Sequence, residues 1–124
     1  MKIRELLFRE FADCGVNILP DDVRIESDSV PCARMSIIIG NDDVPFHSRG
    51  ILKFQIFSKS GDGYAASEAI AEKLVSQLLY KTLPDENNSL QFLSYSTQTH
   101  GEDPQNPSLS MFELILNFNF FGEP

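Results

Sequence analysis

Residues 49–79, RGILKFQIFSKSGDGYAASEAIAEKLVSQLL, contain the pattern from which the fold is best predicted. Between positions 50 and 59, side chains alternate between two faces with the period of two that is typical of a strand. After Gly63 the apolar residues recur every three to four positions, as on one face of a helix, and the pattern ends before Pro84. The stretch therefore predicts a strand, a glycine-containing turn and a helix. The buried row expected on this helix consists of Ala66, Ile70, Leu74 and Leu78.

The residues before this stretch predict one helix and one strand. Positions 2–14 carry apolar side chains three and four apart, which predicts an amphipathic helix closed by Gly15. A polar connector over 17–31 leads to the β-branched run 32–39, which predicts a strand. We expect this strand to pair with 50–59 as a hairpin with a long loop.

The residues after it predict two strands. A weaker strand is expected at 90–99, followed by a polar loop at 100–108. The element order is therefore α-β-β-α-β-β, and we expect a single α+β domain over residues 1–124, with two helices packed on one face of a four-stranded mixed sheet. A right-handed crossover would join 50–59 to 90–99. The last strand has five apolar residues on one face, which should form the floor of the core: Phe112, Leu114, Leu116, Phe118 and Phe120.

The chain is acidic, with a net charge of −8 and a pI near 4.6. Nucleic-acid binding draws its affinity from Lys and Arg side chains that neutralise phosphates, so we do not expect direct binding to DNA or to an anionic membrane. Cys14 and Cys32 lack the spacing of a metal or redox motif, and we expect reduced thiols in a cytosolic protein. No apolar run is long enough for a membrane span or a signal peptide, so the protein should act where it is made.

The turn Gly61-Asp62-Gly63 raises the question of a phosphate-binding loop. It lacks the three spaced glycines of a dinucleotide fingerprint, and it lacks the Lys followed by Ser or Thr of a P-loop. Asp62 would place a carboxylate where an anionic ligand would lie. The same carboxylate would interact favourably with the helix dipole and with the free N–H groups of the first turn. We therefore predict a structural turn in which Asp62 stabilises the start of the helix.

No constellation for catalysis or metal binding is evident in the sequence. His47 and His100 fall in separate predicted loops, whereas metal ligands normally come in clusters. The carboxylate pairs at 21–22 and at Asp42 and Asp43 are typical of solvated turns. There is no G-x-S-x-G nucleophile motif, although composition alone leaves a Ser-His-Asp arrangement open. We predict no catalytic residues, no metal and no cofactor.

The second faces of two strands are only half polar. Ile51 and Phe57 share a side with Lys53 and Gln55, and Met111 and Ile115 share one with Glu113. A half-apolar outer face often marks a contact with a partner. We predict an oligomer interface there, and the alternative is that these are isolated surface hydrophobes or lie under the first helix. The predicted interface residues are Ile51, Phe57, Met111 and Ile115.

The segment RGILKFQIF at 49–57, followed by GDGYAASEAIAE at 61–72, resembles the tail terminator (tail completion, or minor tail) proteins of long-tailed bacteriophages and prophages. That family often has an Arg-Gly pair before an apolar strand, here Arg49 and Gly50, then a short glycine-containing turn and a helix rich in small residues. The resemblance extends in architecture to the first helix and the closing strand. It implies a non-enzymatic structural virion protein that forms a hexameric ring on the tail tube, ends tube polymerisation and provides the head-joining surface.

The resemblance also implies partners and a location. The partners would be the tail tube protein and a head-tail connector protein, and the protein would assemble in the bacterial cytoplasm and remain in the tail of the virion. DNA would pass through the ring without specific binding, which an acidic lumen favours because like charges repel. We expect four loop carboxylates at the lumen or rim: Asp42, Asp43, Glu102 and Asp103.

Three alternatives stay open at this point. Another phage neck or head-tail joining adaptor would differ from a terminator chiefly in its partner. A small ligand-binding or hydrolytic domain would use the sheet face or the turn at 61–63. A dimeric regulator or toxin-antitoxin partner that binds DNA would need a basic patch, which the charge balance disfavours.

Overall fold

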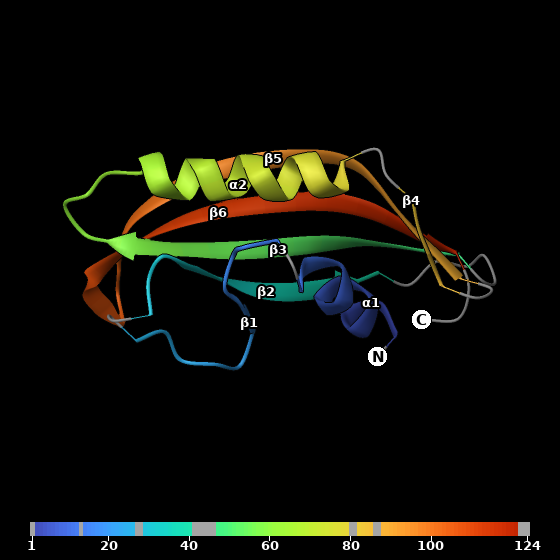
Figure 1. The fold of residues 1–124 in the computed structure, drawn as a ribbon, viewed down its shortest axis with the longest axis horizontal. Helices are drawn as coiled ribbons and strands as arrows, with labels where there is room; N and C mark the ends of the chain where they lie inside the picture. Colours follow the sequence, from blue (N-terminus) through green and yellow to red (C-terminus); the bar gives the residue numbers. More distant parts are fainter. Residues whose placement is uncertain are drawn as a thin grey trace.

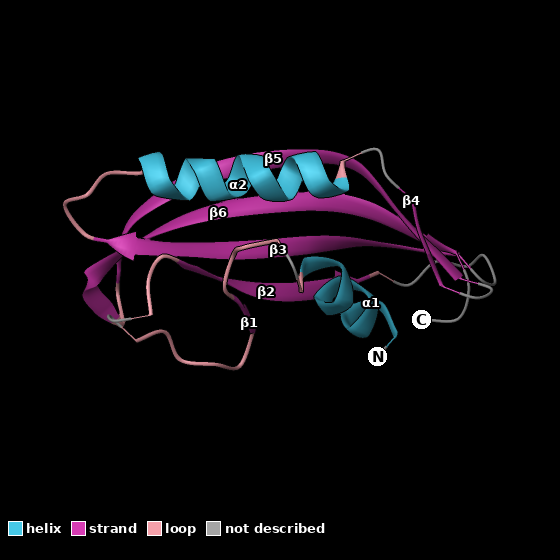
Figure 2. Ribbon diagram, viewed as in Figure 1, coloured by secondary structure: helices cyan, strands magenta, loops and turns pink. Residues whose placement is uncertain are grey.

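A six-stranded sheet runs the length of the molecule, and two helices lie against it (Figures 1 and 2). This computed structural model describes residues 2–12, 14–26, 29–40, 47–79, 82–85 and 88–121. The strand order across the sheet is β1-β2-β3-β6-β5-β4. In chain order the elements are α1 (Lys2–Phe11), β1 (Ile18–Pro20), β2 (Cys32–Ile39), β3 (His47–Lys59), α2 (Ala65–Leu78), β4 (Thr82–Asp85), β5 (Asn88–Asp103) and β6 (Asn106–Phe121).

The α+β class and the mixed sheet are confirmed, but the predicted element order and strand number are wrong. Two short strands, β1 and β4, were not predicted. β1 pairs with β2 in parallel, whereas β4 pairs with β5 in antiparallel fashion. Each is only three or four residues long and contains a proline, so neither shows an alternation long enough to predict a strand.

At the centre of the sheet one pairing was predicted and two others were not. β2 and β3 form the predicted antiparallel hairpin, with Met35 opposite Phe54, and β6 lies on the other side of β3 with Leu114 opposite Phe54. β5 pairs antiparallel with β6, so β3 and β5 run in the same direction with β6 between them. The chain passes from β3 to β5 through α2, in the position predicted for the crossover.

The predicted polar loop at 100–108 is instead the end of a long β5–β6 hairpin. Asp103 is opposite Asn106, and the register shifts near Gly101, which has a positive φ of 75°. A glycine in this conformation lets a bulged strand bend and continue, which a search for alternating side chains does not detect. His100 therefore lies in β5, and His47 begins β3, so the prediction that both histidines lie in loops is wrong.

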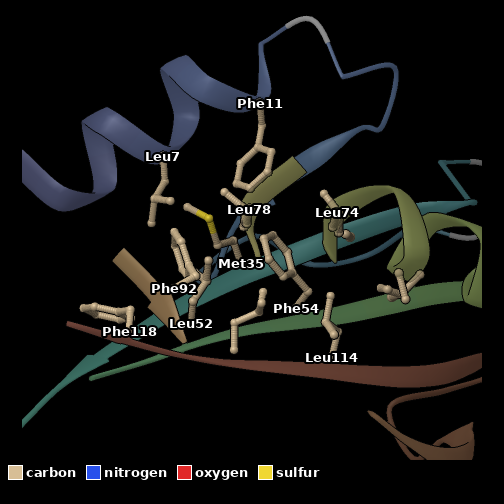
Figure 3. Packing of buried hydrophobic residues seen from close by; sticks show 14 of the residues in the cluster. Leu7, Phe11, Met35, Leu52, Phe54, Leu74, Leu78, Phe92, Leu114 and Phe118 are labelled. Atoms are coloured by element: carbon tan, nitrogen blue, oxygen red, sulfur yellow. The ribbon is translucent and has the colours of Figure 1, made fainter. Parts of the chain in front are cut away.

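The main hydrophobic cluster lies between the helices and one face of the sheet (Figure 3). Leu7 and Phe11 of α1 belong to it, as do Leu74 and Leu78 of α2, so both helices pack on the same face. The ring of Phe11 meets the ring of Phe54 edge to face, with centroids 5.5 Å apart. All five residues predicted as the floor of the core are buried: Phe112, Leu114, Leu116, Phe118 and Phe120.

Two details of the helices differ from the predictions. α1 ends at Phe11, three residues before the predicted end, although Gly15 has the positive φ expected near a helix terminus. On α2 the predicted buried row is partly wrong, because Ala66 is exposed and Ile70 is only half-buried. At this end of the helix the buried face is shifted by one position, to Ser67 and Ala71. The buried residues of α2 are Ser67, Ala71, Leu74 and Leu78.

Candidate interaction surface

The four predicted interface residues lie on the sheet face opposite the helices, but one of them, Phe57, is covered by the chain itself. Phe57 is opposite Met111, and its side chain is only 1% exposed. The β1–β2 connector closes over this part of the sheet, where Ile25 and Leu109 form a second buried cluster with Phe57 and Cys32. The prediction that Phe57 is an exposed interface residue is therefore corrected, because Ile25 of the connector that looked like a polar loop helps to bury it. Met111 packs against the same cluster but is only half-buried, so its place in an interface stays a prediction.

Beyond the connector the same face carries a short apolar row that crosses three strands. Ile38 of β2 is opposite Ile51 of β3, and Ile115 of β6 is one pair away, opposite Lys53. Side chains that are diagonal on adjacent strands are within reach of one another. Ile38 is 55% exposed, and Ile51 and Ile115 are half-buried. These three residues are called here the apolar row. They include Ile51 and Ile115, for which an interface role stays a prediction.

Polar side chains beside the apolar row contact one another. Glu113 lies 3.9 Å from the ammonium of Lys53 and 3.6 Å from Nε2 of His100. Nearer the connector, the Arg34 guanidinium donates two hydrogen bonds to Oε1 of Gln55, at 2.9 and 2.7 Å. These contacts give the face a defined polar border. Among the described residues, no group of three His, Cys, Asp or Glu side chains is placed to hold a metal ion.

A groove that the sequence did not predict lies between α2 and β5. It has a volume of about 690 Å³, with Glu68, Glu72 and Val75 on the helix side and Tyr95 and Thr97 on the strand side. Tyr95 and Thr97 face the helix side of the sheet, since they are opposite the buried Leu116 and Leu114, but α2 leaves them exposed. The sequence predicted a strand at 90–99. The incomplete cover by α2 depends on where the helix lies on the sheet, so the sequence pattern does not show it.

The turn at 61–63, between β3 and α2, is held by backbone hydrogen bonding. Gly61 and Gly63 have positive φ angles of 93° and 72°, and the N–H of Asp62 donates to the carbonyl of Lys59 at 3.2 Å. The prediction that Asp62 caps the helix is wrong, because Tyr64 is the N-cap residue and no side chain makes a capping hydrogen bond. The Tyr64 hydroxyl instead accepts a hydrogen bond of 2.8 Å from the N–H of Gly101. The helix start is thus tied to the bulge in β5.

The predicted lumen carboxylates are only partly placed. Asp42 and Asp43 lie outside the described residues. Glu102 is exposed near the tip of the β5–β6 hairpin, and Oδ1 of Asp103 accepts a hydrogen bond of 3.3 Å from the N–H of Gln105 within the tip. The lumen or rim role of the four carboxylates stays a prediction.

Both cysteines are free thiols, and they lie in different environments. Cys14 is half-buried, whereas Cys32 is fully buried beside Phe57. Burial raises the pKa of the Cys32 thiol, while a hydrogen bond with Ser29 and the charge of Arg34 act in the opposite direction.

None of the described helices is both long and apolar enough to cross a membrane.

Comparison with known proteins supports the fold and nothing finer. No known family profile and no curated protein matches the chain. Eighteen solved chains are similar in structure. One of them superimposes with a TM-score of 0.72 over 98% of this chain and 95% of its own, at 12% sequence identity. The arrangement of sheet and helices therefore occurs in another protein of similar length, and at this identity the likeness shows the fold alone.

Proposed function

We propose that the protein is a tail terminator of a long-tailed phage or prophage. In this proposal it forms a ring, hexameric in the resembling family, that caps the tail tube, ends its polymerisation and presents a surface to the head-tail connector. The resemblance in residues 49–79 suggests the family. The structural observation that carries the proposal is the apolar row of Ile38, Ile51 and Ile115, which crosses three strands on the face that no described helix covers.

The apolar row has the chemistry of a subunit contact. Burying apolar surface contributes about 25 cal/mol per Å², and an exposed row of branched side chains on a single chain leaves that contribution unused. Lys53 and Glu113 lie beside the row and would give the contact polarity and direction. The segments that carry the resemblance form the expected strand and helix: residues 49–59 belong to β3, and residues 65–78 form α2.

The charge of the chain suits a ring through which DNA passes. A net charge of −8 would repel a phosphate backbone, so the DNA would not adhere to the lumen. Glu102 is exposed at the hairpin tip, where it would face either the lumen or the rim.

Native mass spectrometry of the purified protein tests the proposal. The protein is measured over a wide concentration range, alone and then mixed with the tail tube protein from the same source. Six-fold species, alone or on the tube, support the proposal. Strict monomers that ignore the tube protein overturn it. The matched variants are Ile115→Thr, which should weaken assembly, and Ala66→Thr on the exposed side of α2, which should leave assembly unchanged.

Two other functions give different results in the same mixtures. A neck adaptor would bind the head-tail connector protein and leave the tube protein free. A small ligand-binding domain is favoured by one observation, the groove with Glu72 and Tyr95 on its two sides. In that case small molecules would shift the amide resonances of Val75 and Tyr95 in the monomer, and the Ile115→Thr variant would bind them normally.

A further inference from the structure

Both long edges of the sheet are open over part of their length. β4 pairs with β5 only at residues 88–91, and β1 pairs with β2 only at 33–35. Among the described residues, no strand pairs with the outer side of Ser94–Thr99 in β5 or of Ser36–Ile39 in β2. Such an edge presents unpaired N–H and C=O groups and is a template for a further strand.

Neither open edge carries the features that normally prevent pairing. Proteins usually protect an edge with charged side chains, prolines or bulges. The β5 edge reads Ser-Tyr-Ser-Thr-Gln-Thr over 94–99, without a charge or a proline, and its register with β6 is regular between the bulges at Phe92/Ser94 and Thr99/Gly101. The β2 edge reads Ser-Ile-Ile-Ile over 36–39, which is uncharged and rich in β-branched residues.

The directions of the two edges are complementary. β2, β3, β6 and β5 are successive antiparallel neighbours, so β2 and β5 run in opposite directions at the two sides of the sheet. If a second copy extends the sheet with its helices on the same side, its β2 edge therefore meets the β5 edge of the first copy in antiparallel orientation. The contact uses two different surfaces, and contacts of this kind generate rings when the rotation closes.

We propose that the β5 edge binds the β2 edge of a second copy of this chain, so that one sheet continues from subunit to subunit. The inference rests on the proposed ring and names the strands that would join it. In this register Ile37 lies opposite Thr99 of the next copy, Ile38 opposite Gln98, and Ile39 opposite Thr97. The window ends where β1 takes over the outer side of β2 and where β5 bulges at Gly101.

This register keeps like faces together. Ile37 and Ile39 pack against the main cluster on the helix side of β2, and Thr97 faces the helix side of β5, in the groove beside α2. Figure 1 shows α2 near the β5 edge of the sheet and α1 near the β2 edge. Both helices lie on the same face. In the extended sheet, α1 of one copy would therefore come next to the α2–β5 groove of its neighbour and cover the exposed Tyr95.

Cross-linking between engineered cysteines tests the pairing. Ile38→Cys and Gln98→Cys place thiols on the open faces of β2 and β5, both exposed, and Cys14→Ser is included in every variant to remove the native half-buried thiol. With a short bismaleimide, the chain that carries both cysteines should give a ladder of multimers. A mixture of the two single variants should give dimers alone. The reagent is applied to the concentrated protein, alone and with the tail tube protein.

Other outcomes overturn the inference. Cross-links of Gln98→Cys chains to one another would show a two-fold pairing of β5 with β5, and cross-links among Ile38→Cys chains would show the same for β2. The absence of any cross-link, both in the protein alone and in the presence of the tail tube protein, would show that the edges stay free.

A second variant, Thr97→Lys, puts a charge in the middle of the β5 edge and should abolish the ladder. Its control is Ala66→Lys on the exposed side of α2, which should leave the ladder intact.

The result separates this inference from the proposed function. Six-fold species on the tube protein without a link between positions 38 and 98 would keep the tail terminator proposal and reject this interface. Multimers linked between 38 and 98 that ignore the tube protein would support the interface and reject the proposed function.

Discussion

Gly50 is the residue whose replacement has the clearest expected cost. It lies on the helix side of β3, opposite Phe118 of β6. A Cβ atom built there would be 2.5 Å from the carbonyl oxygen of Ile38 and 2.5 Å from the ring of Phe118. Non-bonded heavy atoms normally stay about 3.5 to 4 Å apart, so Gly50→Ala requires the β2 backbone and the Phe118 ring both to move by about 1 Å.

The expected loss is about 2 kcal/mol in the free energy of unfolding. Overpacking a well-filled core costs about 1 to 3 kcal/mol, and the upper part applies because one of the two contacts is with backbone. The reduced entropy of the unfolded chain gives back about 0.4 to 1 kcal/mol when Gly becomes Ala. For a domain of this size, 2 kcal/mol corresponds to a fall in Tm of about 8 °C.

Urea unfolding followed by circular dichroism measures this loss. The matched control is Gly40→Ala in the same hairpin. Among the described residues, its new Cβ would meet only the carbonyl oxygen of Arg49, at an ordinary distance of 3.4 Å, so it should change stability little. In a double variant, Phe118→Leu should lessen the cost of Gly50→Ala, because it removes the ring contact. If Gly50→Ala stays within about 0.5 kcal/mol of the wild type, the proposed close packing of β2, β3 and β6 is refuted.

Four further predictions concern individual side chains. Tyr64→Phe removes the acceptor for the N–H of Gly101 and should cost about 1 kcal/mol in urea unfolding, with faster hydrogen exchange at Gly101; unchanged exchange would contradict the contact. Cys14 should react with a thiol reagent well before Cys32, and equal rates would contradict the burial of Cys32. Burial raises the pKa of Cys32, so the protonated thiol should contribute to the free energy of unfolding below the ordinary thiol pKa of 9.0, and this contribution should decline as the pH rises above it. Urea unfolding measured against pH, with Cys32→Ala as reference, tests this. Glu113→Gln should change the free energy of unfolding by less than about 1 kcal/mol, since the Lys53 ammonium 3.9 Å from Glu113 is partly solvated, and a larger loss would contradict this.

The strands and the helix with long, regular patterns could be predicted from the sequence. In β6, five apolar residues in alternation specify one buried face, and all five are buried. In β3 the two predicted faces are also correct, with Leu52, Phe54 and Ile56 buried on the helix side. The period of α2 was correct, and Leu74 and Leu78 are buried as expected, but the first half of the helix buries Ser67 where Ala66 was expected. Small residues on several sides of a helix leave the choice of face to tertiary packing.

The features that depend on contacts between distant segments could not be predicted. β1 and β4 are strands because longer strands offer them an edge, and their own three or four residues carry too little pattern. The polar appearance of the β1–β2 connector concealed Ile25, which covers Phe57 and turns a predicted interface residue into a buried one. Likewise, the long hairpin at 100–108 depends on a bulge at Gly101 that is held by Tyr64 from another element.

The two candidate contact surfaces differ in how far the sequence reveals them. The apolar row was partly visible, because Ile51 and Ile115 each stand on the polar side of a predicted strand. The open edges were not visible, because an edge is a property of strand order and not of any strand by itself. The segment 94–99 would be ordinary in the middle of a sheet, where both sides of its backbone are paired. It becomes a docking surface only because β6 inserts between β3 and β5 and moves β5 to the outside, while β4 pairs with the first few residues of β5 and no more.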